Sequence, residues 1–323
     1  FRIIYLKNIY TFKAVKFDSL IFLHAFMGNK NSKWYILLIL AVVWGSSFIL
    51  MKKGLDGGMN AYQLGAYRIL FTSLFLGVFF GKEFFKIPST KFKYIFLAGL
   101  LGNFFPIFLF ALAQTQISSS ISSTLNSFTP LNTLIIGSLF FGLTFSRKQI
   151  LGLLIGIVGC LVLVYAGASG NPSKNYWFAL LVIVATWCYA ANINMVKKYL
   201  SDVSPLAITV GNFAFLLIPS VLILFFNGFD FQTTHQISDG LAITDNIHPL
   251  FYVAILGIVG TGLANIYFYR LIQMSSPVFA SNVTYLIPIV ATIWSMIFNE
   301  GVTLIQILGT IIILFGVYIT NRK

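Results

Sequence analysis

The chain has 323 residues, of which 58% are hydrophobic and only 9% are charged, and its mean hydropathy is +0.88. A soluble domain carries about 25% charged residues, so this composition excludes a solvated globular surface and indicates a membrane protein. The formal net charge is +13. The basic residues stand in short groups between apolar runs and not on one amphipathic face, which argues against nucleic-acid binding.

The first 33 residues form a basic segment ahead of the first apolar run. Residues 1–26 resemble neither a membrane span nor a signal peptide, because their longest uncharged stretch, residues 19–26, is too short for an apolar region and a cleavage site. Met27 begins a short basic segment that directly precedes the first span and resembles a natural start. We hypothesise that residues 1–26 are an over-extended reading frame or a disordered basic tail.

Ten apolar runs follow, each close to the roughly 20 residues that cross a bilayer. They cover residues 34–51, 61–81, 93–113, 118–142, 148–167, 177–196, 205–226, 250–273, 278–298 and 303–320. The predicted fold class is therefore an all-α, polytopic membrane protein with ten transmembrane helices. The one long connection, 227–249, holds three of the eight carboxylates and no Lys or Arg.

The basic residues orient these spans. With a cytoplasmic N-terminus, seventeen Lys and Arg residues fall on the inner side, and only Lys52, Lys53 and Lys174 fall on the outer side. The inner residues are Arg2, Lys7, Lys13, Lys16, Lys30, Lys33, Lys82, Lys86, Lys91, Lys93, Arg147, Lys148, Lys197, Lys198, Arg270, Arg322 and Lys323. Because basic residues accumulate in cytoplasmic loops, we expect both termini to lie in the cytoplasm.

The chain also repeats itself. Residues 141–152 align with 298–309 at an offset of 157, Pro130 pairs with Pro288, and Trp44 and Trp187 stand near corresponding places. We therefore expect two five-helix repeats, residues 34–167 and 177–320. An odd number of spans in each repeat places the repeats in opposite orientations, which is typical of secondary transporters.

Glycines at packing spacing mark the fifth and tenth spans, at positions 152, 156, 159, 309 and 316. Small residues let helix backbones approach closely in lipid. These two spans carry no charge in their core, so we expect each to pack on the outside of its repeat without touching substrate.

The order of these features resembles the drug/metabolite transporter superfamily, specifically its ten-helix EamA-type permeases. The resemblance rests on V-V-W-G-S-S-F-I-L at 42–50, on Arg68, and on the segments 111–131 and 299–319. It implies two inverted bundles around a central cavity, alternating access, and export or permeation of a small molecule. The first half has Leu143 where the second half has Glu300, the acidic residue that such permeases often show there.

Arg68 is the one basic residue that this orientation assigns to neither side, and it lies within a span, about seven residues into the second apolar run. Its repeat counterpart is Asn212, so the charge is not a symmetric structural element. A guanidinium suits a carboxylate or phosphate ligand. It also suits helix-end carbonyls reached by snorkelling, and the sequence leaves both interpretations open.

Uncharged polar and aromatic residues in the spans complete the candidate site. Asparagines donate and accept hydrogen bonds, which suits a polar substrate but equally suits contacts between helices; aromatic rings line cavities or anchor helices at the interface. The predicted cavity residues are Trp44, Ser47, Arg68, Asn103, Asn126, Trp187, Tyr189, Asn192, Asn265, Asn282 and Tyr285.

No carboxylate or histidine stands in the middle of a span, and no nucleotide-binding, hydrolase or metal-ligand motif appears. We therefore expect no enzyme activity, no cofactor, no metal and no nucleic acid. The predicted function is a secondary transporter of the plasma (inner) membrane that exports a small polar or amphipathic metabolite. An importer or exchanger of an anionic metabolite anchored by Arg68 and a non-transporting membrane scaffold are the alternatives. The expected partners are the substrate and the lipid bilayer, with a homodimer left open.

Overall fold

The computed structural model describes residues 32–144, 146–168, 176–230, 248–297 and 304–321. All regular secondary structure in these ranges is helical. The proposed start at Met27, Glu300 and most of the connection 227–249 lie outside the described residues.

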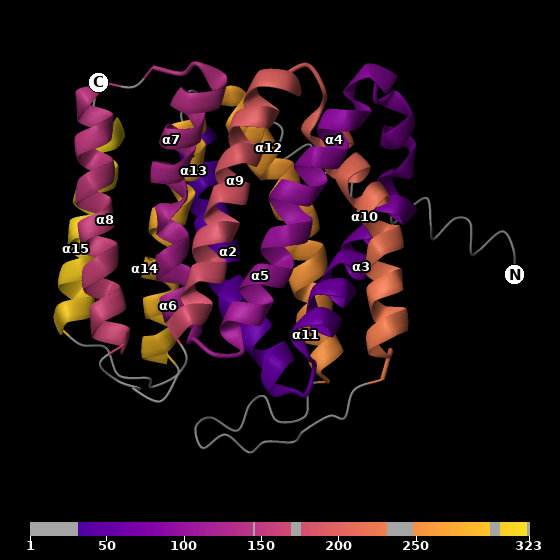
Figure 1. Ribbon diagram of the computed structural model, residues 1–323, viewed down its shortest axis with the longest axis horizontal. Coiled ribbons are helices and arrows are strands. Elements are labelled where there is room, and N and C mark those ends of the chain that lie inside the picture. The colour runs from indigo at the N-terminus through magenta and orange to yellow at the C-terminus, as the bar shows by residue number, and fades with distance from the viewer. Residues whose placement is uncertain (1–31, 145, 169–175, 231–247, 298–303, 322–323) are drawn as a thin grey trace, which may run out of the picture.

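The α-helices follow one another along the chain with short connections (Figure 1). They are α2 (Ser32–Asp56), α3 (Ala61–Phe80), α4 (Phe92–Gly99), α5 (Phe105–Gln114), α6 (Ser119–Leu125), α7 (Thr129–Phe141), α8 (Arg147–Ala168), α9 (Ala179–Tyr199), α10 (Pro205–Asn227), α11 (Pro249–Gly257), α12 (Ala264–Met274), α13 (Pro277–Ser281), α14 (Val283–Ile297) and α15 (Leu304–Asn321). Six helical segments of the described chain are long and apolar enough to cross a membrane. They are Ser32–Asp56, Ala61–Lys86, Ser89–Gln114, Ala179–Tyr199, Pro205–Asn227 and Pro249–Met274.

Several expected spans are not uniform α-helices. A π-helical turn, η3 (Leu100–Phe104), joins α4 to α5, and a second one, η6 (Ile258–Leu263), joins α11 to α12. A 3₁₀ turn, η4 (Asn126–Phe128), separates α6 from α7. Such turns leave backbone groups outside the regular α-helical ladder and frequently occur at functional sites.

Side-chain caps define where several helices begin. Before α3, Asn60 Oδ1 accepts from Gln63 N at 2.8 Å, and Gln63 Oε1 accepts from Asn60 N at 3.1 Å. Ser204 and Ser276 cap α10 and α13 by a single bond, since each hydroxyl oxygen accepts from the backbone amide three residues later, and each serine is followed by a proline at the first helical position. These caps satisfy amide groups that have no partner inside the helix.

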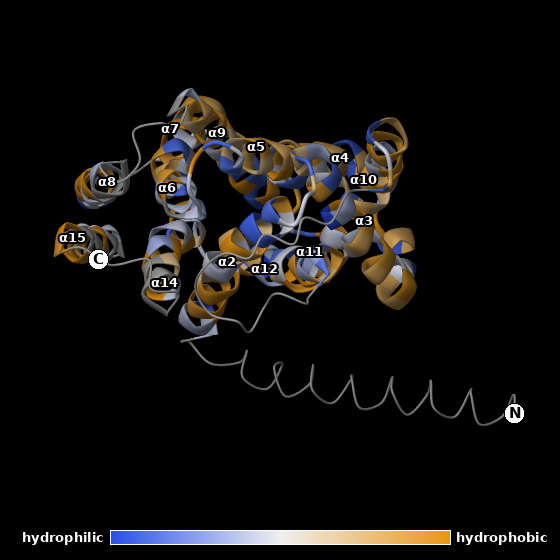
Figure 2. Ribbon diagram, turned by 90° about the horizontal axis from the view of Figure 1, so that it is seen from below, coloured by the Kyte–Doolittle hydropathy of each residue, from blue (hydrophilic) through white to orange (hydrophobic). Residues whose placement is uncertain are grey.

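The helices form two layers, seen end-on in Figure 2. One layer contains α7, α9, α5 and α4, with α10 at its edge; the other contains α14, α2, α11 with α12, and α3. The chain segments before and after residues 169–175 contribute helices to both layers. Consequently the two halves of the chain are interleaved and not side by side.

Helices α8 and α15 stand next to each other at one end of the layers (Figure 2). A Cβ atom built on Gly152 would lie 2.6 Å from Gly316 O, and one built on Gly159 would lie 2.8 Å from Gly309 O. Since Gly152 meets Gly316 and Gly159 meets Gly309, the two helices run antiparallel with their backbones in contact.

We predict that Gly316→Ala lowers the unfolding temperature. Its Cβ would lie 2.6 Å from Gly156 N, and overpacking of this kind costs about 1–3 kcal/mol because the neighbouring backbone must move. The matched control is Gly77→Ala in α3, where no atom of the described residues lies within 4 Å, so that this variant keeps or raises stability. Thermal unfolding of the purified proteins measures both, and equal behaviour of the two variants would contradict the packing argument.

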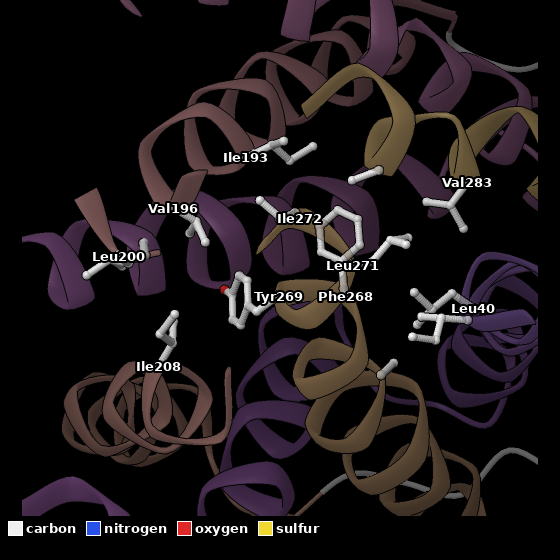
Figure 3. Packing of buried hydrophobic residues seen from close by; sticks show 14 of the residues in the cluster. Leu40, Ile193, Val196, Leu200, Ile208, Phe268, Tyr269, Leu271, Ile272 and Val283 are labelled. Carbon is white, nitrogen blue, oxygen red and sulfur yellow. The ribbon is translucent and has the colours of Figure 1, made fainter. Parts of the chain in front are cut away.

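Two buried hydrophobic clusters occupy opposite ends of the bundle. The first, shown in Figure 3, gathers Leu40 from α2, Val196 from α9, Ile208 from α10 and Ile272 from α12. The second contains Met51 from the later part of α2, with residues of α3, α5, α6 and α11. We call them the upper and lower clusters, because the end of α9 and the start of α10 lie at the top of Figure 1 and the start of α11 lies at the bottom.

An ion pair ties the two halves of the chain together above the upper cluster. Lys91 Nζ lies 2.8 Å from Asp202 Oδ1 and donates to Tyr199 O at 2.8 Å. The hydrogen bond from Lys91 holds the pKa of the Asp202 carboxyl below its ordinary value. This contact therefore stabilises the fold while Asp202 is ionised, and its contribution is lost as the pH falls through that lowered pKa.

We predict that Asp202→Asn lowers the free energy of unfolding by less than about 1 kcal/mol at pH 7, since Asp202 is mostly exposed. The difference from the unmodified protein should begin to shrink as the pH falls to about 4, the ordinary pKa of an aspartate. It should disappear only below the lowered pKa of the folded protein, where the native carboxyl also becomes neutral. Thermal unfolding of both proteins over this pH range, at low ionic strength, measures the effect. A difference that does not decrease at all between pH 7 and about pH 3 would mean that the charge of Asp202 is not its cause.

Candidate functional site: a cavity between the two layers

A cavity lies between the two helix layers, with side chains of the upper and lower clusters at its boundary. Its lining includes most of the predicted residues, namely Trp44, Ser47, Arg68, Asn103, Asn126, Tyr189, Asn192 and Asn265. The other lining residues are Phe48, Met51, Gly102, Ile107, Phe110, Thr129, Ile193, Gly260, Thr261, Phe268, Thr284 and Ile287. Helices from both halves of the chain thus build one site.

The two π turns bring α2 and α9 close to the cavity. A Cβ atom on Gly102 would lie 2.4 Å from Asn192 Nδ2, and one on Gly260 would lie 2.7 Å from Ser47 Oγ. Each glycine therefore admits a polar side chain from the neighbouring helix of the same layer. A larger residue at either position would push that helix away.

Two pairs of aromatic rings lie at the cavity, one from each helix layer. Trp44 meets Phe268 edge-on with ring centroids 4.9 Å apart, and Tyr189 stacks on Phe110 at 6.0 Å. Trp44 Nε1 also donates to the π-turn carbonyl Gly260 O at 2.9 Å. Tyr189, two residues after Trp187, therefore takes the place in the second half that Trp44 has in the first.

Arg68 projects from α3 into this cavity and is only 9% exposed. Its Nε donates to Thr261 Oγ1 at 2.7 Å, and Thr261 Oγ1 donates to Leu256 O at 2.9 Å. No Asp or Glu oxygen of the described residues lies within 4 Å of the guanidinium. The cavity consequently contains a cationic group without a carboxylate partner from the described chain.

A chain of buried amides extends from the cavity into the protein. Asn265 Nδ2 donates to Asn103 Oδ1 at 2.6 Å, and Asn103 Nδ2 donates to the Tyr269 hydroxyl at 3.4 Å. With the Asn212 amide oriented to satisfy both of its ends, Tyr269 donates to Asn212 Oδ1 at 2.7 Å. Asn212 Nδ2 then donates to Ile95 O at 2.8 Å. The network gives the buried polar groups along this path hydrogen-bond partners.

The structure places three predicted residues outside the cavity. Trp187 is 41% exposed on the outer face of α9, because the register of α9 turns Tyr189 inward instead. Asn282 is buried where α13 meets α14 and does not reach the cavity wall. Tyr285 packs against α8, with its hydroxyl 3.4 Å from Leu153 O.

Several lining residues were not predicted, although the repeat points to some of them. At an offset of 158, Asn103 corresponds to Thr261 and Asn126 to Thr284, and all four line the cavity. Applying the repeat to each predicted asparagine would have identified both threonines. The apolar lining residues carry no such signal, since their side chains resemble any other buried residue of a span.

Comparison with known proteins identifies the family. The model of the EamA-like transporter family matches residues 32–165 and again residues 176–322. The chain belongs to the EamA-like transporter family. With its apolar membrane-spanning helices, it is a multi-pass membrane protein of a transporter family, as the sequence motifs predicted.

Similar proteins carry transporter names. A probable amino-acid metabolite efflux pump of Salmonella typhimurium is 26% identical over 88% of this chain and 93% of its own length. An S-adenosylmethionine/S-adenosylhomocysteine transporter of Chlamydia muridarum is 25% identical over 59% of this chain and 61% of its own length. A solved crystal structure aligns with a TM-score of 0.69 at 13% identity, covering 91% of this chain and 98% of the other, which shows a shared fold.

We predict that Tyr269→Phe destabilises the protein. Tyr269 is fully buried, and removing its hydroxyl leaves Asn212 and Asn103 each without one hydrogen-bond partner. An unsatisfied buried polar group costs about 1–3 kcal/mol. Tyr318→Phe, at a residue that is 59% exposed on α15, is the matched control and should leave the unfolding temperature unchanged. A Tyr269→Phe protein as stable as this control would show that the amide chain contributes nothing.

Proposed function

We propose that this protein is a secondary transporter that exports a small polar or amphipathic metabolite across the plasma membrane by alternating access. The observation that carries the proposal is the cavity itself, which lies between two hydrophobic clusters and is lined from both halves of the chain. A site between two separable contacts is what alternating access requires.

The proposed architecture is ten transmembrane helices in two inverted repeats, residues 34–167 and 177–320. Contacts between helices support it, because α7 packs on α9 as α14 packs on α2, and α4 packs on α10 as α11 packs on α3. In the proposed repeat, the helices α2, α3, α4 and α7 correspond to α9, α10, α11 and α14. Exchanging corresponding helices turns the first contact of each comparison into the second. The antiparallel pairing of α8 with α15, which are corresponding helices, also supports opposite orientations.

We place both termini in the cytoplasm. Lys197 and Lys198 at the end of α9, and Arg147 and Lys148 at the start of α8, belong to helix ends at the top of Figure 1. Lys52 and Lys53 belong to the end of α2, at the bottom. This asymmetry favours a cytoplasmic upper end under the positive-inside rule.

In this orientation the upper cluster acts as the cytoplasmic gate and the lower cluster as the external gate. Access from the cytoplasm requires the side chains of the upper cluster, among them Leu40 and Ile272, to move apart and the Lys91–Asp202 pair to open. The interleaved layers allow this, since tilting one half against the other parts the contacts at one end and closes those at the other.

The direction of transport rests on the relatives that are named efflux pumps. Import or exchange of an anionic metabolite through the same cavity is the second candidate, and the position of Arg68 in the cavity favours an anionic ligand whichever way it is carried. A membrane scaffold without transport is the third candidate, and it predicts no flux at all.

Metabolite profiling of medium and cytosol tests the proposal. Cells that produce the protein are compared with cells that produce Asn192→Trp, which fills the cavity, or Leu139→Trp, which adds the same ring to a residue of α7 that is 71% exposed. We predict that a metabolite accumulates in the medium with the unmodified protein and with Leu139→Trp, and that Asn192→Trp abolishes this at an equal membrane level.

Depletion of a metabolite from the medium would replace export by import. Identical metabolite profiles for cells with and without the protein, under several nutrient conditions, would reject transport in favour of the scaffold.

A further inference from the structure

The two halves of the chain place different side chains at one equivalent position. Helix α3 crosses α11 at Gly257, where a Cβ atom would lie 2.8 Å from Arg68 O. Helix α10 crosses α4 at Gly99, where a Cβ atom would lie 3.4 Å from Asn212 O. Both glycines come directly before a π turn. Arg68 and Asn212 therefore occupy the same place in the repeated architecture.

Asn212 shows what the fold requires at this place. Its amide is fully buried and is satisfied by Ile95 O, Ile208 O and the Tyr269 hydroxyl, all of them neutral groups of the protein. It does not line the cavity. A neutral amide therefore suffices to hold the crossing of these helices, and a positive charge is not needed for it.

Arg68 differs from Asn212 in carrying a charge that the described chain does not neutralise. Its Nε is bonded to Thr261, and among the described residues the guanidinium makes no other hydrogen bond and no ion pair. The residue is buried within the bundle, which excludes snorkelling to the membrane surface. A buried charge without a partner is costly in a membrane. The presence of the Arg68 charge therefore points to a ligand.

The bond to Thr261 also fixes how a ligand would bind. With Nε occupied, the two Nη groups remain as a parallel pair of donors, the arrangement that grips both oxygens of a carboxylate. The same cavity presents the rings of Phe48 and Phe110, and none of the described residues that line it is an Asp or Glu. An ammonium group would therefore find no opposite charge here.

We propose that the ligand of this cavity is a small organic carboxylate with an apolar or aromatic body and no ammonium group, held by the Nη groups of Arg68. This rests on the proposed function, because it assigns the substrate class of the same cavity. Thr261 orients the guanidinium, and the aromatic pairs receive the body of the ligand. Cations are rejected by Arg68, and zwitterions bind less well because their ammonium group loses water without gaining a partner.

Four probes that share a phenyl ring and differ in charge test this proposal on the purified protein. They are phenylacetate, 2-phenylethanol, phenylethylamine and phenylalanine. Dissociation constants are measured by calorimetry and by the ligand-dependent rise in unfolding temperature. We expect phenylacetate to bind the unmodified protein at least about 10-fold more tightly than each of the other three, since a charge-assisted hydrogen bond is worth that factor.

Arg68→Asn copies the residue that the repeat uses at Asn212, which makes it the variant most compatible with the fold. We expect it to weaken phenylacetate binding about 10- to 100-fold and to leave 2-phenylethanol binding unchanged. Arg68→Lys keeps the charge without the paired donors and should bind phenylacetate with intermediate affinity. The unfolding temperature of each variant without ligand provides the control for folding.

Three results would overturn the proposal: no binding of phenylacetate, tighter binding of phenylethylamine or phenylalanine than of phenylacetate, or unchanged phenylacetate affinity in Arg68→Asn. The comparison of the four probes needs no variant, so it decides the question even if Arg68→Asn fails to fold. Binding without any flux in the metabolite experiment would reject transport alone. Flux without any preference for the carboxylate would reject only the assignment of the ligand.

Discussion

Close approach of helix backbones at glycine is the constraint on which this structure depends. Apolar attraction between helices is weak in lipid, so helices associate through dispersion contacts at short range. At Gly45, a Cβ atom would lie 2.6 Å from Val290 Cβ, and at Gly152 one would lie 2.5 Å from Thr320 N. The first contact joins α2 to α14 within a layer, and the second joins α8 to α15 at the end of the layers.

The same constraint shapes the cavity. Gly102 and Gly260 sit in the π turns, where the regular hydrogen-bond ladder is interrupted, and they let Asn192 and Ser47 approach. Polar backbone at this depth is tolerated only where it is buried in protein or lines a cavity. Gly260 O, for example, accepts from Trp44 Nε1. The glycines that hold the helices together thus also expose the polar groups that a ligand can use.

Much of this architecture could be predicted from sequence, because lipid imposes a simple rule on composition. Runs of apolar residues predicted the membrane helices, and family resemblance predicted a transporter. Rotation about the helix axis was harder, since a membrane helix is apolar on every face. Trp187 and Tyr189 stand two residues apart on α9, and only packing decides that Tyr189 faces the cavity. Asn282 and Tyr285 were equally plausible from sequence, but the break between α13 and α14 directs them away from the cavity.

The uncompensated charge of Arg68 bears on the energy source for transport. In the part of the chain that the structure describes, the residues lining the cavity include no carboxylate or histidine that could carry a proton. A monovalent anion that leaves the cell, however, moves with the electric field of an interior-negative membrane, which contributes about 2.3 kcal/mol per 100 mV. On the proposal that the ligand is a carboxylate held by Arg68, the membrane potential therefore favours its export over its import without a coupled ion.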